Sequence, residues 1–134
     1  MRYLADTSTV VRVDRGQVDP QWIETVKRGL VAVCEPVLAE TLTLADAKQY
    51  EIAEERLRAA YPWVPVADNV WELVAAIRRD LGERSAHQGV SVADYVIAAT
   101  AIRLKLVLLH EDGDFETIAR FIPELKQRRI STLP

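Results

Sequence analysis

Two short apolar runs of the chain each lead into acidic residues, and this pattern limits how the chain can fold. Asp6 directly follows the first run, residues 1–5. Asp112 and Asp114 closely follow the second run, residues 104–109. Apolar runs of this length predict buried strands. If the two strands are parallel neighbours, their carboxyl ends lie at one edge of a sheet, where ligands bind in open sheets of this class. Asp6 and Asp112 are then expected side by side.

Further strand and helix patterns alternate along the chain. A β-branched run predicts a second strand over 30–34, and Trp63-Val64 predicts a short strand or an extended connector. Apolar spacing of three and four residues predicts helices that begin near residues 10, 20, 36, 52, 67, 92 and 115, and a last strand is expected near Ile130. Such alternation is typical of a parallel sheet covered on both faces. The sequence therefore predicts one α/β domain over residues 1–134, with three α/β/α layers around a mainly parallel sheet of four or five strands.

Composition excludes several classes of protein. The 134 residues are 49% hydrophobic, which suits one globular domain with a real core. Cys34 is the only cysteine and lies in an apolar run, so it is expected to be a buried small hydrophobe rather than a disulfide partner. One cysteine and two histidines argue against a zinc site. Neither a signal peptide nor a membrane span is visible, and a cytoplasmic location is expected.

The net charge of −3 counts mildly against a nucleic-acid partner, since such proteins are usually basic. However, five of the 20 acids would form the candidate site, and the basic residues cluster locally, as at Arg78-Arg79 and Arg128-Arg129. The distribution of charge on the surface, rather than the net charge, therefore decides this question.

Two further acids lie in or near helical patterns, and together the acids indicate a metal site. Glu40 lies one turn after Pro36, and Asp94 lies in the first turn of the helix that follows Ser91. Crowded carboxylates repel one another and need a counter-charge. Ligands that are all oxygen favour Mg2+ or Mn2+, and such ions commonly support phosphoryl chemistry.

Each acid also has a structural explanation. Asp6 can cap a turn or the next helix, with Thr7 and Ser8 orienting its carboxylate. The Ser91-to-Asp94 spacing fits a capping box, and Glu40 is equally explained as a surface residue.

The turn after the second apolar run has a structural explanation as well. Asp112 and Asp114 can form a loop in which Asp114 caps the following helix. The spacing of these acids does not fit an EF-hand. His110 is left out of the catalytic set, because a lone histidine at a strand end is more often structural. No phosphate-binding glycine loop and no nucleophile elbow is present.

Four segments, taken in order, resemble PIN domains. They are Leu4–Ser8, Pro36–Leu42, Ser91–Ala101 and Leu108–Phe115, which together span almost the whole chain. The size is most similar to the VapC toxins of toxin–antitoxin pairs. One departure is His110, where many relatives have threonine.

The resemblance implies a metal-dependent endoribonuclease that cleaves structured RNA, such as tRNA or rRNA. In that assignment Asp6, Asp94 and Asp112 hold Mg2+ or Mn2+, while Glu40 and Asp114 position further metal or the nucleophilic water. It also implies a homodimer and a VapB-like antitoxin, for which the early helices are expected to offer a groove lined by Trp22, Ile23, Leu38 and Leu42. Two alternatives remain: a solitary PIN-domain nuclease of RNA processing, and a non-catalytic protein-binding module.

Overall fold

The central sheet has four strands in the order β2-β1-β3-β4, and every neighbouring pair is parallel. In the computed structural model, which describes residues 1–134, the strands are β1 (Tyr3–Ala5), β2 (Val31–Ala32), β3 (Val107–His110) and β4 (Gln127–Arg129). The predicted parallel sheet is thus confirmed in its four-stranded form. Because all strands run the same way, their carboxyl ends lie at one edge of the sheet.

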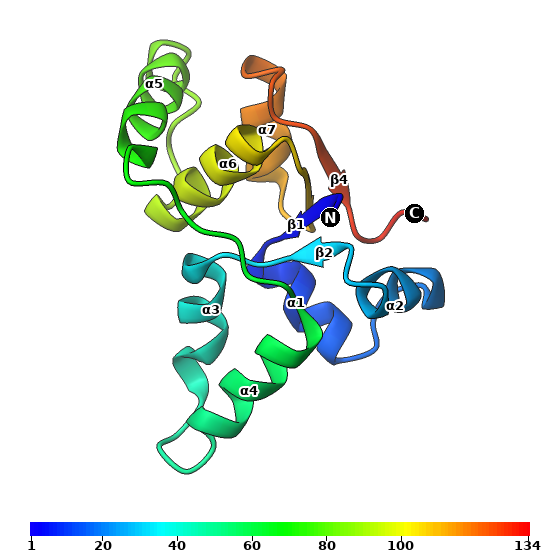
Figure 1. The fold of residues 1–134 in the computed structure, drawn as a ribbon. Coiled ribbons are helices and arrows are strands. Elements are labelled where there is room, and N and C mark those ends of the chain that lie inside the picture. The colour runs from blue at the N-terminus through cyan, green and yellow to red at the C-terminus, as the bar shows by residue number, and fades with distance from the viewer.

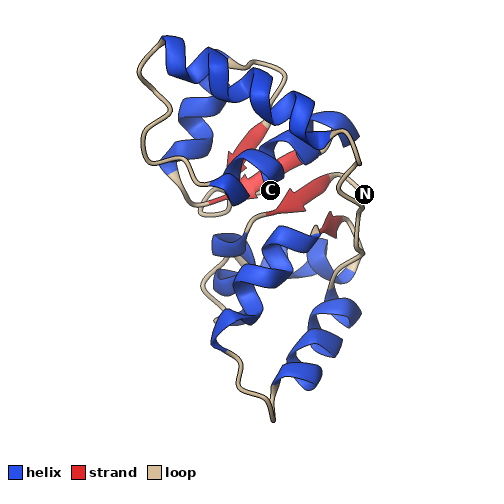
Figure 2. Ribbon diagram, turned by 90° about the vertical axis from the view of Figure 1, so that its left-hand side faces the viewer, coloured by secondary structure: helices blue, strands red, loops and turns tan.

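Seven α-helices and one 3-10 helix connect the strands. They are α1 (Thr7–Asp14), α2 (Pro20–Lys27), α3 (Glu35–Thr41), the 3-10 helix η1 (Leu42–Leu44), α4 (Tyr50–Ala60), α5 (Val70–Glu83), α6 (Val92–Leu104) and α7 (Gly113–Phe121). Helices α5, α6 and α7 lie on one side of the sheet, and α1 and α2 lie on the other (Figures 1 and 2). This arrangement confirms the three α/β/α layers. No helix has both the length and the apolar character needed to cross a bilayer.

Side-chain caps explain where two of the helices begin. The Asp19 carboxylate accepts a hydrogen bond from the Gln21 N–H at 2.8 Å at the start of α2, where Pro20 occupies the first turn. The Ser91 hydroxyl accepts from the Asp94 N–H at 3.1 Å at the start of α6. Helix α6 ends at Leu104, and the left-handed φ of 56° at the C-cap Lys105 stops it; its start at Val92 confirms the predicted one.

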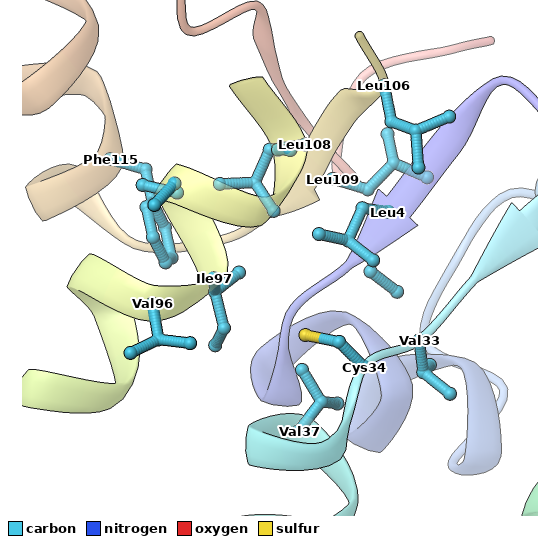
Figure 3. Close-up of a cluster of buried hydrophobic side chains, with 14 of the residues drawn as sticks. Leu4, Val33, Cys34, Val37, Val96, Ile97, Leu106, Leu108, Leu109 and Phe115 are labelled. Carbon is cyan, nitrogen blue, oxygen red and sulfur yellow. The ribbon is translucent and has the colours of Figure 1, made fainter. Parts of the chain in front are cut away.

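The hydrophobic core lies between the sheet and the helices. Figure 3 shows side chains of the sheet, such as Leu4 and Leu108, close to Ile97 of α6. Leu4 and Leu108 are fully buried and Ile97 is almost so. Cys34 is also fully buried in this cluster, which confirms the expected packing role of its side chain.

The second strand is shorter than the sequence predicts. Only Val31 and Ala32 pair with β1, and Val33 instead forms an isolated parallel bridge with Trp63. Residues 63–64 are therefore an extended connector that continues the pairing for one step. Helix α4 is separate from α3, because η1 and a loop over 45–49 interrupt the helical pattern.

Only some of the residues named for the expected groove line an apolar cavity: Leu42 lines one between α1, η1 and α4, and Ile23 lines a second between α1, α2 and α4. Trp22 and Leu38 are only 0% and 2% exposed, so they belong to the interior. The Trp22 indole instead packs edge-on against Tyr3, and its N–H donates to the Thr132 carbonyl. Ile23 alone of the four is half-buried.

Candidate active site

Asp6 follows β1 and is held by three hydrogen-bonding contacts. One carboxylate oxygen accepts from the Thr9 N–H at 2.9 Å, which caps α1 as expected. The Ser8 hydroxyl lies 2.8 Å from both oxygens, and it accepts from the Glu111 N–H at 3.0 Å. Ser8 therefore joins the carboxyl ends of β1 and β3. Burial raises the pKa of Asp6, against the opposing effect of the hydrogen bonds from Thr9 and Ser8.

Glu40 lies near the end of α3 and reaches the same edge of the sheet. Its Oε1 accepts from the Thr7 hydroxyl at 2.7 Å. The expectation that Thr7 orients Asp6 is therefore wrong, since Thr7 holds Glu40 and only Ser8 orients Asp6. Glu40 is exposed, but its position beside the end of β1 distinguishes it from the solvated acids of α4.

Asp112 and Asp114 lie where the chain passes from β3 into α7, and we define residues 111–114 as the acidic turn. The expectation that Asp114 caps α7 is wrong. The helix begins at Gly113, so Asp112 is the capping residue and its carboxylate accepts from the Asp114 N–H at 2.9 Å. Asp114 lies in the first turn of the helix, where a negative charge is favoured by the helix dipole.

The fold brings the predicted acids together at the carboxyl edge of the sheet. Single carboxylate oxygens of Asp94, Asp112 and Asp114 lie within 4.8 Å of one another. A cavity of about 290 Å3 joins this group to the two remaining acids; its lining residues are Asp6, Thr7, Ser8, Glu40, Asp94, Ile97 and Asp112. The predicted metal ligands were Asp6, Asp94 and Asp112, whereas the three closest carboxylates are those of Asp94, Asp112 and Asp114. Asp6 lines the same cavity. The assignment of Asp6 as a metal ligand stays a prediction.

Repulsion from neighbouring carboxylates adds to burial in raising the pKa values of Asp94 and Asp114. Burial, followed by the neighbouring charges of Asp112 and Asp114, raises the pKa of Asp94 to about 6 despite its hydrogen bonds with Ser91. The pKa of Asp114 is also raised, first by burial and then by Asp112. No basic side chain lines the cavity. The acids therefore have no positive partner among the residues that line it.

The donor set fits a hard divalent cation. Three carboxylates this close together offer only oxygen ligands and need a counter-charge, and both features suit Mg2+ or Mn2+. His110 does not add a nitrogen ligand. Its Nδ1 accepts from the Asp112 N–H at 3.0 Å, so its proton is on Nε2, which contacts the Gln127 Oε1 at 2.6 Å. Both ring nitrogens are thus occupied within the protein, and the omission of His110 from the catalytic set stays a prediction.

We expect metal binding to weaken as the pH falls through about 6, because a proton then competes for the Asp94 carboxylate. In the metal-free protein the same raised pKa has the opposite consequence for folding. The folded state retains a proton that the unfolded state releases above 3.8, so this contribution to stability is complete below 3.8 and is lost as the pH rises through about 6. Mn2+ titrations near pH 5 and near pH 7.5 check the first statement, and equal affinities would contradict it.

Sequence reasoning missed one group of residues beside the acidic turn. Arg129 of β4 forms ion pairs with Glu111 and Glu116, at 3.0 and 2.6 Å. Ser131 also donates to Glu111 through its N–H and its hydroxyl. No local pattern indicates these contacts, because all residues of β4 are polar and the partners are distant in sequence.

Comparison with known proteins identifies the family of this chain. The PIN domain family matches residues 3–121. Ribonuclease VapC6 of Mycobacterium tuberculosis is 34% identical over 101 residues, which cover 75% of this chain and 80% of the relative. Ribonuclease VapC2 of the same species is 30% identical over 131 residues, covering 95% and 92%.

Solved structures show the same fold. The VapBC-1 structure from nontypeable Haemophilus influenzae includes a chain that matches with a TM-score of 0.79 at 17% identity, covering 98% of this chain and 100% of that one. A chain of VapBC-5 from Mycobacterium tuberculosis matches with a TM-score of 0.65 at 23% identity, covering 96% and 98%. From the family match and the sequence identity to curated relatives, the chain belongs to the PIN-domain family and, within it, to the VapC ribonucleases.

Proposed function

We propose that this protein is a metal-dependent endoribonuclease and the toxin of a VapBC-type toxin–antitoxin pair, cleaving phosphodiesters of structured RNA such as tRNA or rRNA. The observation that carries the proposal is the cavity at the carboxyl edge of the sheet, which is lined by Asp6, Glu40, Asp94 and Asp112 from four separate segments. The ribonuclease relatives support the choice of RNA as substrate. Its place of action would be the cytoplasm, where these RNAs are found.

The acids would divide the work between cation binding and proton transfer. Asp94, Asp112 and Asp114 would hold Mg2+ or Mn2+, with Asp6 as a further ligand. A bound cation of this kind lowers the pKa of water and stabilises negative charge on a phosphoryl group. Without it, the carboxylates of the cavity would repel an RNA phosphate rather than bind it.

Glu40 is the candidate for accepting a proton from the attacking water. The Thr7 hydroxyl fixes its Oε1, which leaves Oε2 without a hydrogen-bond partner within the protein. A carboxylate that is fixed through one oxygen can present the other in a constant direction, as a general base requires. Ser8 in turn keeps Asp6 oriented towards the cavity by its contacts with both carboxylate oxygens.

The antitoxin would occupy an apolar cavity that is distinct from the acidic one. This cavity of about 310 Å3 lies between α1, η1 and α4, and its apolar lining includes Val10, Leu44 and Leu57. Leu44, which is 96% exposed, belongs to this mainly apolar lining, and contiguous exposed apolar patches mark protein-interaction sites. An amphipathic helix is the kind of segment that fits such a groove. We also propose that the chain forms a homodimer, as the family resemblance implies.

Cleavage of total RNA by purified, antitoxin-free protein tests the function. We expect discrete products with Mg2+ or Mn2+ and none with EDTA, because the acidic cavity needs a cation to bind phosphate. An Asp6→Asn variant should be inactive, while a Glu55→Gln variant, altered on the exposed face of α4, should cleave normally. Cleavage that survives EDTA would contradict the metal requirement. No cleavage and no metal-induced rise in Tm would favour the non-catalytic binding module.

The same assay separates the toxin from a solitary RNA-processing nuclease. If the protein is a toxin, a gene next to its own encodes a small antitoxin, and adding this antitoxin inhibits RNA cleavage. A purified protein whose cleavage no such partner silences would be the solitary nuclease instead.

A further inference from the structure

Strand β4 presents a row of polar side chains to the acidic turn. Gln127 and Arg129 are alternate residues of β4, which point to the same face, and Ser131 follows in the turn after the strand, where it contacts Glu111. The register pairs Arg129 with His110, the last residue of β3, immediately before the acidic turn. The Ile130 N–H continues the pairing by donating to the His110 carbonyl at 2.8 Å. The row therefore lies directly beside the turn that carries Asp112 and Asp114.

The first member of the row acts through His110. Gln127 Oε1 contacts the His110 Nε2 at 2.6 Å, and the His110 Nδ1 accepts from the Asp112 N–H at 3.0 Å. His110 is fully buried, so no water competes for either nitrogen. A hydrogen-bonded chain thus runs from β4 to the backbone of Asp112.

Arg129 holds the turn from both of its ends. Its Nη1 donates to the Glu111 Oε2 at 3.0 Å, and its Nη2 donates to the Glu116 Oε1 at 2.6 Å. Glu111 immediately precedes Asp112, and Glu116 lies two residues after Asp114. The planar guanidinium group suits such a bridge, because its donors point in fixed directions. Ser131 adds two hydrogen bonds to Glu111, both at 3.1 Å.

We propose that Arg129 is a positioning residue, which bridges Glu111 and Glu116 and so holds the acidic turn where Asp112 and Asp114 face Asp94. The inference rests on the proposed metal site. Arg129 does not line the acidic cavity and is not a ligand; it acts through the two glutamates. Outer residues that orient metal ligands typically affect metal affinity by about 10- to 100-fold.

The sign of the effect distinguishes positioning from simple electrostatics. A positive charge near the site repels a cation, so charge alone predicts that removing Arg129 tightens metal binding. Positioning predicts the reverse, because Asp112 and Asp114 lose the arrangement in which they share a cation with Asp94. A general loss of stability would lower the Tm, and it would not weaken metal binding at Arg129 alone.

Arg128 provides a matched control on the same strand. It is the neighbour of Arg129, but it lies on the opposite face, with its guanidinium group 5.6 Å from the centre of the Trp22 ring. It donates to Thr132 and to the Leu133 carbonyl, so its removal also breaks local contacts. Arg128→Gln therefore removes the same charge from β4 without touching the acidic turn.

Isothermal titration of Mn2+ into wild type, Arg129→Gln and Arg128→Gln tests the proposal, with Tm measured for each. We expect Arg129→Gln to weaken Mn2+ binding at least about tenfold and Arg128→Gln to leave it unchanged. Arg129→Lys, which keeps the charge but lacks the planar pair of donors, should also weaken binding, whereas charge alone predicts no change; it serves if Arg129→Gln does not fold.

Unchanged or tighter binding in Arg129→Gln, or unchanged binding in Arg129→Lys where that variant replaces it, would overturn the proposal while the metal site itself stands. Equal weakening in Arg128→Gln would overturn it too, because the effect would then not depend on the acidic turn. Wild-type protein that binds no Mn2+ would overturn the proposed metal site and, with it, the role of Arg129.

Discussion

Asp94→Asn is expected to abolish metal binding and to lower the rate of RNA cleavage at least about 1,000-fold. A bound cation stabilises the transition state by several kcal/mol, and each 1.36 kcal/mol corresponds to about a factor of ten. Asp94 contributes one of the three clustered carboxylates and lines the acidic cavity. The amide of asparagine keeps the shape of the side chain but supplies no negative charge.

The fold should survive this substitution. The cap of α6 is the Ser91 hydroxyl, which accepts from the backbone N–H of residue 94 and does not depend on the side chain there. Removing a charge that burial and two neighbouring aspartates disfavour should even raise the Tm of the metal-free protein at neutral pH. Asp68→Asn, on an exposed loop, is the matched control. Normal cleavage by pure Asp94→Asn protein would remove Asp94 from the site.

Phe115→Ala is expected to destabilise the protein by about 3–5 kcal/mol, which is the usual range for truncating a buried aromatic side chain. Phe115 is fully buried in the first turn of α7. Its ring centre lies 5.3 Å from that of His110, the residue that contacts the backbone of Asp112. The cavity left by the substitution would therefore lie directly beneath the acidic turn.

Urea denaturation measures this effect from the change in midpoint at constant slope. Trp71→Ala is the control, because Trp71 is 57% exposed on α5 and its removal should change stability by less than about 0.5 kcal/mol. If Phe115→Ala lowers the free energy of unfolding by less than about 1 kcal/mol, the packing of the Phe115 ring does not stabilise this part of the fold as expected.

The parts of the fold that were predictable depend on local signals. The bounds of α6 followed from Ser91, whose hydroxyl caps the helix. The meeting of Asp6 with Asp112 followed from two apolar strands with acids after them, once the strands were taken as parallel neighbours. In both cases each element is decided by residues close together in the sequence, and the pairing of β1 with β3 is the one long-range step.

The parts that were missed depend on partners far along the chain. Val33 leaves the second strand because Trp63, thirty residues later, offers the pairing groups. Strand β4 contains only polar residues, so no apolar pattern predicts where it begins and ends. Its bounds are set by its pairing with β3. The predicted cap of α7, Asp114, lies two residues too late, because Gly113 enters the helix and makes Asp112 the capping residue.

The location of Mn2+ in crystals of the wild-type protein tests the central claim most directly, since anomalous scattering identifies the ion and its ligands. The account predicts an anomalous peak at the carboxyl edge of the sheet, bound by oxygens of Asp94, Asp112 and Asp114 and close to Asp6. No peak there at an Mn2+ concentration that supports cleavage, or a peak held by other residues, would contradict the account.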